Sequence, residues 1–263
     1  MIKLNQIIDA MEQMAPVCLK EDFDNVGLMV GDKMAMVKKV LLALDCTLEV
    51  IEEAKELKAD LIITHHPLIF NRPKSITTDT LQGKKIIELI KNNINLYSSH
   101  TNLDSAFGGL NQTIVEMLGF ESNEILEKSK ITSYGNVGLG RMIRLETEMN
   151  LKDLIDTVKS KLKINTLRVV EGNRKIKNIA VINGSGQSFI KQAVNEGADC
   201  IITGDTTYHF ALDYKEMGVT IIDTGHFGSE WLVFLETMKK IKNQFKEIEF
   251  IESKKVEDPY TFI

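Results

Sequence analysis

The chain is poor in the residues that build disulfide frameworks and flexible linkers. Its 263 residues include three cysteines, which lie far apart, and four prolines. An odd number of cysteines without a CxxC pair argues against both a disulfide framework and a zinc knuckle. No low-complexity or proline-rich stretch separates one part of the chain from another. A globular protein of the reducing cytoplasm is therefore expected.

The chain also has no excess of positive charge and no long apolar run. The net charge of −5 arises from 32 basic and 37 acidic residues that are mixed along the sequence. Without a basic face, nucleic acid is not an expected partner. No apolar run is long enough to span a membrane, and the first fifteen residues carry a helical stripe rather than a signal-peptide core. Membrane attachment is therefore not expected.

Apolar runs of strand length alternate with helical patterns, which is typical of an α/β fold with largely parallel sheets. The chain is long enough for one large domain or two smaller ones with a substantial core. Strands are predicted over residues 40–44, 61–64, 94–98, 179–182, 200–203 and 219–224. Helices are predicted near residues 48–58, 81–92, 109–118, 151–162, 187–196, 207–217 and 229–243.

The two ends of the chain repeat a pattern. The run A-D-x-I-I-T that includes Asp60 recurs around Asp199, a spacing of 139 residues (199 − 60). This predicts two duplicated α/β halves, residues 1–122 and 175–263. Residues 123–174 are predicted to form a β–α insertion, with a strand over 134–145. The insertion contains no histidine, so no chemistry is expected from it.

Four of the five histidines fall in three places that suit metal ligation. Two of them, His65 and His66, directly follow a predicted strand. The other two each precede a carboxylate by four residues, a spacing that shares one face of a helix. These pairs are His100 with Asp104 and His226 with Glu230. Because ligands gather at the carboxyl ends of parallel strands, the groups are expected to converge on a metal site.

The donor types narrow the choice of metal. Imidazole nitrogens with carboxylate oxygens suit zinc, manganese, iron or nickel, whereas calcium prefers oxygen alone. The supply of ligands exceeds the need of one tetrahedral ion. A pair of divalent ions that share a carboxylate is therefore expected.

Three further segments are weaker candidates. The acidic stretch 21–31, with Asp24 and Asn25, reads equally well as a turn entering a strand and as a loop that lines a pocket. Asp205 follows a predicted strand, and His209 four residues later lies either near the site or on a surface helix. Gly184-Ser185-Gly186 suggests a phosphate-binding turn, but it lacks the third glycine of a dinucleotide motif and the lysine of a P-loop.

Taken together, these segments resemble one known family. The matching motifs are E-D-F-D-N-V-G-L-M-V-G at 21–31, A-D-L-I-I-T-H-H-P at 59–67, H-T-N-L-D at 100–104, N-G-S-G at 183–186, A-D-C-I-I-T-G-D at 198–205 and G-H-F-G-S-E at 225–230. They resemble the GTP cyclohydrolase 1 type 2 homologue family, also called the Nif-three-like proteins. The resemblance implies two similar halves around a dinuclear metal site and a toroidal homohexamer.

Carried over by position, the resemblance implies five metal ligands, with Glu230 bridging the two ions. They are His65, His66, Asp104, His226 and Glu230. The expected substrate pocket comprises Asp24, Asn25, His100, Asp205 and His209. Asp205 stands where many relatives carry glutamate, and the central insertion is shorter than in the long relatives. A regulatory role of that extra domain is therefore not carried over.

The expected function is that of a metal-dependent hydrolase of a small heterocyclic or nucleotide-like substrate. The family name suggests ring opening of GTP, with His100 or His209 moving a proton. Two alternatives stay open. One is a non-catalytic metal-binding scaffold or a metal-handling or interaction protein, and the other is a two-metal phosphoesterase. For the phosphoesterase, Arg72 and Lys74 are the candidate cations.

Overall fold

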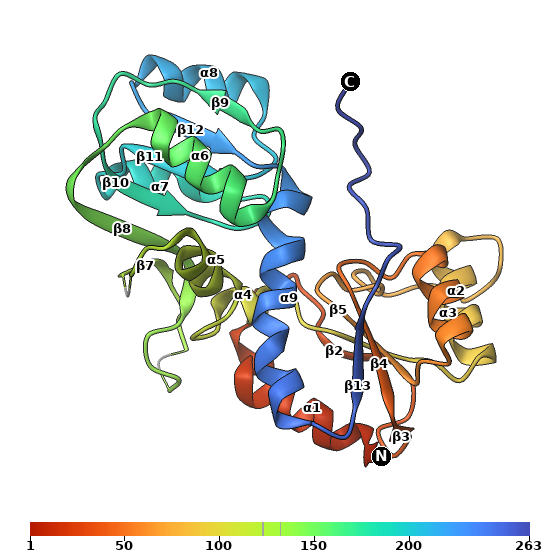
Figure 1. Cartoon of the computed structure of the whole chain (residues 1–263). Helices are drawn as coiled ribbons and strands as arrows, with labels where there is room; N and C mark the ends of the chain where they lie inside the picture. The colour runs from red at the N-terminus through yellow and green to blue at the C-terminus, as the bar shows by residue number, and fades with distance from the viewer. Residues whose placement is uncertain (123, 132) are drawn as a thin grey trace. The chain divides into compact units, whose positions relative to one another are not determined.

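The computed structural model describes residues 1–122, 124–131 and 133–263. The chain forms two compact units, each with its own sheet and its own core (Figure 1). The first unit comprises residues 1–103 and 234–257, and the second comprises residues 104–233 and 258–263. No helix in the described part of the chain is long and apolar enough to cross a membrane.

The first unit is built on a five-stranded sheet whose inner strands are parallel. Its strand order is β13 (Glu249–Glu252), β4 (Lys39–Ala43), β5 (Leu61–Thr64), β6 (Asn95–Ser98) and β2 (Gly27–Val30). Only β2 runs antiparallel to its neighbour. Strands β5 and β6 are buried along their whole length, because helices cover both faces of the sheet.

Helices α2 (Leu48–Leu57) and α3 (Leu81–Lys91) pack on one face of this sheet. Each begins at a threonine whose side chain accepts a backbone N–H, Thr47 for α2 and Thr80 for α3. Helix α1 (Leu4–Met14) and the C-terminal part of α9 (His226–Gln244) lie on the opposite face (Figure 1). Strands β1 (Ile2–Lys3) and β3 (Met36–Val37) form a separate antiparallel pair.

The second unit is built on a six-stranded mixed sheet. Its strand order is β7 (Glu124–Lys128), β8 (Gly138–Met149), β10 (Ile176–Val181), β11 (Cys200–Thr203), β12 (Thr220–Asp223) and β9 (Arg168–Val170). The inner trio β10, β11 and β12 is parallel, and the other strands are antiparallel. The mixed α/β class that the sequence predicts is confirmed, with antiparallel strands at the sheet edges.

Helices cover both faces of the second sheet. Helix α7 (Ile190–Asn195) and helix α8 (Tyr208–Glu216) pack on one face, where Ile190, Ala193 and Tyr214 join the core. Helix α5 (Leu110–Leu118) contacts β8 and β10 and packs against α6 (Leu151–Leu162). The short helices α4 (Thr101–Ser105), η1 (Val17–Leu19) and η2 (Gln187–Phe189) complete the described elements.

The segment between the predicted halves joins the second sheet. Strands β7, β8 and β9 pair with one another or with β10 and β12. The strand predicted over residues 134–145 corresponds to β8, which begins only at Gly138. Residues 133–136 form the turn that precedes it, and Gly138 has a φ of 148°. The predicted division at residues 122 and 175 stays a prediction, and residue 123 itself lies outside the described residues.

The repeated A-D-x-I-I-T motif has the same structural role in both units. Val40 pairs with Leu61 in the first sheet, and their equivalents Ile179 and Cys200 pair in the second. The spacing of 139 residues is therefore kept in the strand register, as a duplicated unit requires (179 − 40). Just before the motif, the backbone is left-handed in both units. Its φ is 56° at Lys58 and 89° at Gly197.

The aspartate of the motif ties two parallel strands together. Asp60 Oδ2 accepts the backbone N–H of Lys38 at 2.7 Å and of Lys39 at 3.0 Å. Asp199 Oδ2 accepts the backbone N–H groups of Lys177 at 3.2 Å and Asn178 at 2.9 Å. A carboxylate is suited to this position because it can accept two N–H groups at once. The motif is thus explained by backbone geometry rather than by chemistry.

Replacing either aspartate by alanine is expected to lower the free energy of unfolding by about 2 kcal/mol, because two charge-assisted hydrogen bonds are lost. Urea denaturation of Asp60→Ala and Asp199→Ala measures this change. The control is Asp156→Ala, since Asp156 is exposed on α6. Equal midpoints for all three variants would contradict the equivalent roles of Asp60 and Asp199.

Candidate metal centre

In each unit the polar side chains that the sequence selects lie just beyond the carboxyl ends of parallel strands. In the first unit, His65 and His66 follow β5 and His100 follows β6. In the second, Asp205 follows β11 and His226 follows β12. Since ligands bind at these strand ends in open α/β sheets, each unit presents a set of donors where a site is expected.

In all three histidines of the first unit, Nδ1 lies close to an oxygen atom. His65 Nδ1 lies 2.9 Å from the carbonyl oxygen of Ser99. His66 Nδ1 lies 3.0 Å from Asp45 Oδ1, and His100 Nδ1 lies 2.9 Å from Asp24 Oδ1. An oxygen at this distance favours the tautomer that carries the proton on Nδ1, which leaves the Nε2 lone pair for another partner.

These imidazoles are also close to one another. A ring nitrogen from each of His65, His66 and His100 lies within 4.8 Å of those of the other two, so the three could hold one metal ion. His65 is fully buried, whereas the other two are partly exposed. The prediction that His100 lines the pocket rather than binding metal stays a prediction.

Asp24 is the anchor of His100. It is 5% exposed, and its Oδ2 accepts the backbone N–H of Thr101 at 3.0 Å and the Thr101 hydroxyl at 2.6 Å. Burial alone would raise the pKa of this carboxyl, but the hydrogen bonds with His100 and Thr101 hold its pKa well below the ordinary value. Asp24 therefore stays ionised and orients the His100 ring.

Asn25, the second candidate of this loop, has a different set of contacts. Its side-chain amide donates to the carbonyl of Ile69 at 2.6 Å, which ties the 21–26 loop to the loop that follows His66. Its backbone N–H donates to Asp24 Oδ1 at 2.8 Å. Asn25 thus fixes the wall beside the histidines, and its place in the substrate pocket stays a prediction.

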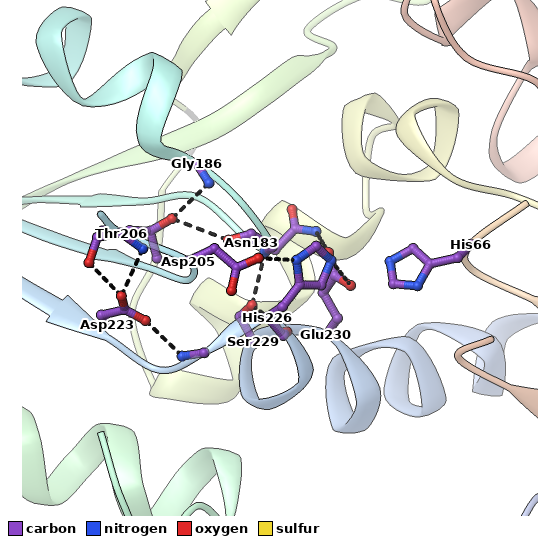
Figure 2. A network of polar contacts seen from close by, with 12 residues as sticks. His66, Asn183, Gly186, Asp205, Thr206, Asp223, His226, Ser229 and Glu230 are labelled. Carbon is purple, nitrogen blue, oxygen red and sulfur yellow. Dashed lines mark hydrogen bonds and ion pairs between the residues drawn. The ribbon is translucent and has the colours of Figure 1, made fainter. Parts of the chain in front are cut away.

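In the second unit, two buried carboxylates share one amide donor. Asp104 is 7% exposed and Glu230 is 2% exposed. The side-chain NH₂ of Asn183 donates to Asp104 Oδ1 at 2.9 Å and to Glu230 Oε1 at 3.3 Å. Figure 2 shows Asn183, His226 and Glu230 side by side. Buried carboxylates are costly unless they are paired, and a bound cation would offset that cost.

His226 completes this group. Its Nε2 lies 3.0 Å from Glu230 Oε2, so the two residues share a face of α9 as their spacing of four predicts. Its Nδ1 lies 2.8 Å from Asp205 Oδ2 (Figure 2). His226 thus shares with the histidines of the first unit an oxygen at Nδ1, and its Nε2 lies beside the Glu230 carboxylate.

Gly184 is required by the position of Glu230. Its φ is 59°, in the left-handed region, and a Cβ atom there would overlap Glu230 Oε1. Its N–H donates to the Ser229 hydroxyl at 2.9 Å, and the N–H of Gly186 donates to the Thr203 hydroxyl at 3.0 Å (Figure 2). Because both N–H groups are already bonded within the protein, the turn is explained without a bound phosphate.

The remaining predicted candidates differ from the expected geometry. Helix α8 begins at Tyr208, so Asp205 lies before the helix and shares no helical face with His209. His209 is exposed, and its ring packs against Tyr208 at a centroid distance of 5.3 Å. Helix α4 begins at Thr101, so His100 likewise precedes the helix that carries Asp104. The spacing of four residues therefore wrongly predicted a shared helical face for each of these two pairs.

Two residues with clear roles at this edge were not selected as candidates from the sequence. Asn183 bridges the two carboxylates, and its only signal was its place in the N-G-S-G motif. Arg168, from the segment expected to lack chemistry, pairs with Asp223 and donates to the carbonyl of Thr206 at 3.0 Å. It places a guanidinium beside the loop that carries Asp205. Arg72 and Lys74 are exposed.

Gly184→Ala is expected to weaken metal binding and to destabilise the protein, because the new methyl group displaces the Glu230 carboxylate. Gly119→Ala is the matched control: its φ is 87°, and nothing lies within 4 Å of its added Cβ. Both variants incur about 1–2 kcal/mol of left-handed backbone strain. Thermal unfolding with and without zinc separates them, and equal zinc-induced shifts in Tm would contradict the assignment.

The comparisons with known proteins agree on one family. The model of the family described as Duf34/NIF3 (NGG1p interacting factor 3) matches residues 2–259. The chain is 56% identical to a Clostridium perfringens protein and 48% identical to a Clostridium acetobutylicum protein, both named GTP cyclohydrolase 1 type 2 homolog. These alignments cover 100% of both chains and 99% of both chains, respectively. A Bacillus cereus protein related to NIF3 has a TM-score of 0.89 at 28% identity, over 100% of this chain and 99% of that one. The chain therefore belongs to the Duf34/NIF3 family.

Proposed function

We propose that this protein is a hydrolase that depends on two divalent metal ions and acts on a small heterocyclic or nucleotide-like substrate. The proposed ligands are His65, His66, Asp104, His226 and Glu230. The observation that carries the proposal is the common environment of the histidine Nδ1 atoms. Each of His65, His66 and His226 has an oxygen at Nδ1, which is the usual arrangement of a metal-binding imidazole.

The donor set fits the proposed metal. The described residues include groups of histidine and carboxylate side chains able to hold an ion, and their nitrogen and oxygen atoms suit zinc, manganese, iron or nickel. The burial of Asp104 and Glu230 beside the same amide supports a positively charged ligand. When bound, divalent ions lower the pKa of a coordinated water and polarise the atom that leaves.

The protein's own residues hold and orient the reacting groups. Asn183 fixes the carboxylates of Asp104 and Glu230, and Asp205 fixes the ring of His226. Asp24 holds His100 with its Nε2 available, so His100 is the better candidate for moving a proton. His209 is the weaker candidate, because it is exposed on α8 and its ring packs on Tyr208.

GTP is the first substrate to test, because the name of the close relatives refers to a GTP cyclohydrolase. Attack on a carbon of the purine imidazole ring is the corresponding reaction. Assembly as a homohexamer in the cytoplasm is part of the same proposal, and it rests on the family resemblance. Fold and family by themselves do not determine the substrate, so activity has to be measured.

Asp45→Ala and Asp205→Ala are each expected to weaken metal binding by about 10- to 100-fold, because each removes the oxygen that orients a ligating imidazole. Competition against a chromophoric chelator measures this affinity. Asp79→Ala and Asp213→Ala are controls, since both residues are exposed. Unchanged affinity in both test variants would show that the carboxylates of Asp45 and Asp205 do not support metal ligands.

Elemental analysis of metal-loaded protein is expected to give two ions per chain and a steep loss in Glu230→Ala, since Glu230 is the proposed shared ligand. Glu247→Ala is the control, because Glu247 is exposed. A stoichiometry below one ion, with unchanged binding in Glu230→Ala, would contradict the dinuclear site.

The same metal-loaded protein is then incubated with GTP while the purine absorbance is followed. Loss of the absorbance, abolished in Glu230→Ala, would support the cyclohydrolase reaction. Turnover of a generic phosphodiester without loss of the purine would favour the phosphoesterase. No turnover of either compound, with two ions bound, would favour the metal-binding scaffold.

A further inference from the structure

Two phenylalanine rings of the first unit are exposed side by side. Phe23 is 65% exposed and Phe70 is 41% exposed. Their ring centroids lie 6.1 Å apart, with an angle of 47° between the ring planes. Exposing a phenylalanine ring to water is unfavourable. Two exposed rings in contact mark a ligand-binding surface more often than a solitary exposed ring does.

The exposure of this pair is fixed by the loops that carry it. Asn25 Nδ2 donates to the carbonyl of Ile69 at 2.6 Å, so the residues next to each phenylalanine are joined. Gln82 Nε2 donates to the carbonyl of Leu68 at 3.0 Å, and the side chains of Leu68 and Ile69 pack against the core. The two residues before Phe70 are therefore partly buried against the core, whereas the Phe70 ring is exposed.

The loop of Phe23 is anchored in the same way. The backbone N–H of Glu21 donates to the Thr101 hydroxyl at 2.9 Å, and Lys20 Nζ donates to the carbonyl of Asp24 at 2.7 Å. Asp24 itself is buried and bonded to Thr101. Both flanks of Phe23 are thus held, and the ring is presented in a defined place before any ligand binds.

The pair continues directly into the histidine cluster. The Phe70 ring lies 6.5 Å from the His100 ring at an angle of 69°. The His100 ring lies 5.1 Å from that of His65 and 5.5 Å from that of His66. A row of rings therefore leads from the exposed Phe23 to the fully buried His65. Apolar faces stand at the outer end of this row, and metal-binding nitrogens stand at the inner end.

We infer that Phe23 and Phe70 form the platform on which a planar heteroaromatic ring of the substrate stacks. This inference rests on the proposed function for the identity of the reacting site, and it specifies the class of substrate. Base rings stack on aromatic side chains through π-faces, and an electron-poor ring is attracted to the electron-rich face of phenylalanine. A ring held there lies next to His100, which is the proposed proton donor or acceptor.

A small ligand fits this surface better than a protein partner does. Glu21 and Asp22 immediately precede Phe23, and Arg72 follows Phe70 by two residues. The cores of protein interfaces are depleted of charged residues, whereas a binding site for a nucleotide combines an aromatic surface with polar and charged groups. The expected ligand of the platform is therefore a planar molecule with polar edges.

Equilibrium binding of guanosine to the full-length, zinc-loaded protein tests the platform. Isothermal calorimetry is expected to show binding of guanosine and no binding of ribose 5-phosphate, which lacks the planar ring. Phe23→Ala and Phe70→Ala are each expected to raise the Kd for guanosine about tenfold. Phe70→Trp keeps a ring and is expected to retain binding. Tyr208→Ala is the control, because Tyr208 is 75% exposed on α8.

Metal content and oligomeric state are measured for each variant. Weakened guanosine binding with unchanged zinc content supports the platform, even where the hydrolase reaction itself is not observed. No guanosine binding by the wild type, or equal Kd values for all variants, would overturn it without bearing on the metal site. A change of oligomeric state in Phe23→Ala, with guanosine binding unaltered, would overturn it in favour of contact with a second copy.

Discussion

The oxygen that lies beside Nδ1 in each of four histidines is the constraint on which the candidate ligands of both units depend. Three of these oxygens are carboxylates, from Asp24, Asp45 and Asp205, and the fourth is the carbonyl of Ser99. An imidazole bonded in this way keeps its proton on Nδ1 and cannot rotate without losing that bond. Its Nε2 then has a fixed direction, as a metal-binding imidazole requires.

The strand register explains why these oxygens lie where they are needed. In each sheet the motif aspartate, Asp60 or Asp199, ties the start of one parallel strand to the loop before the next. Because these hydrogen bonds fix the amino ends of the strands, they also fix the positions of the carboxyl ends. Asp45 then follows β4 beside His66 at the end of β5, and the same order of elements places Asp205 beside His226. The position of the candidate ligands at one end of each sheet thus depends on hydrogen bonds at the opposite end.

The inner strands and most helices could be predicted from the sequence because their apolar patterns are long and regular. The predicted strand 61–64 is β5 and the predicted strand 200–203 is β11, without a shift. Strands β7, β9 and β13 were missed, because short edge strands are only partly buried and carry charged residues. Asn183 and Arg168 were also missed, since their partners lie far away in the sequence. Hydrogen bonds of that kind leave no local pattern.

The buried carboxylates connect metal binding with stability. Asp104 and Glu230 are both nearly inaccessible to water, and both accept from the Asn183 amide, while Glu230 Oε2 also lies 3.0 Å from His226 Nε2. Burying two carboxylates side by side costs free energy. A Cβ atom at Gly184 would overlap Glu230 Oε1, so the glycine leaves room for this carboxylate. The cost of this arrangement is tolerable when a cation binds to the folded state, and at a concentration 100 times its Kd such a ligand stabilises a protein by about 2.7 kcal/mol. A cation bound by these carboxylates would therefore stabilise the folded state as well as occupy the candidate site.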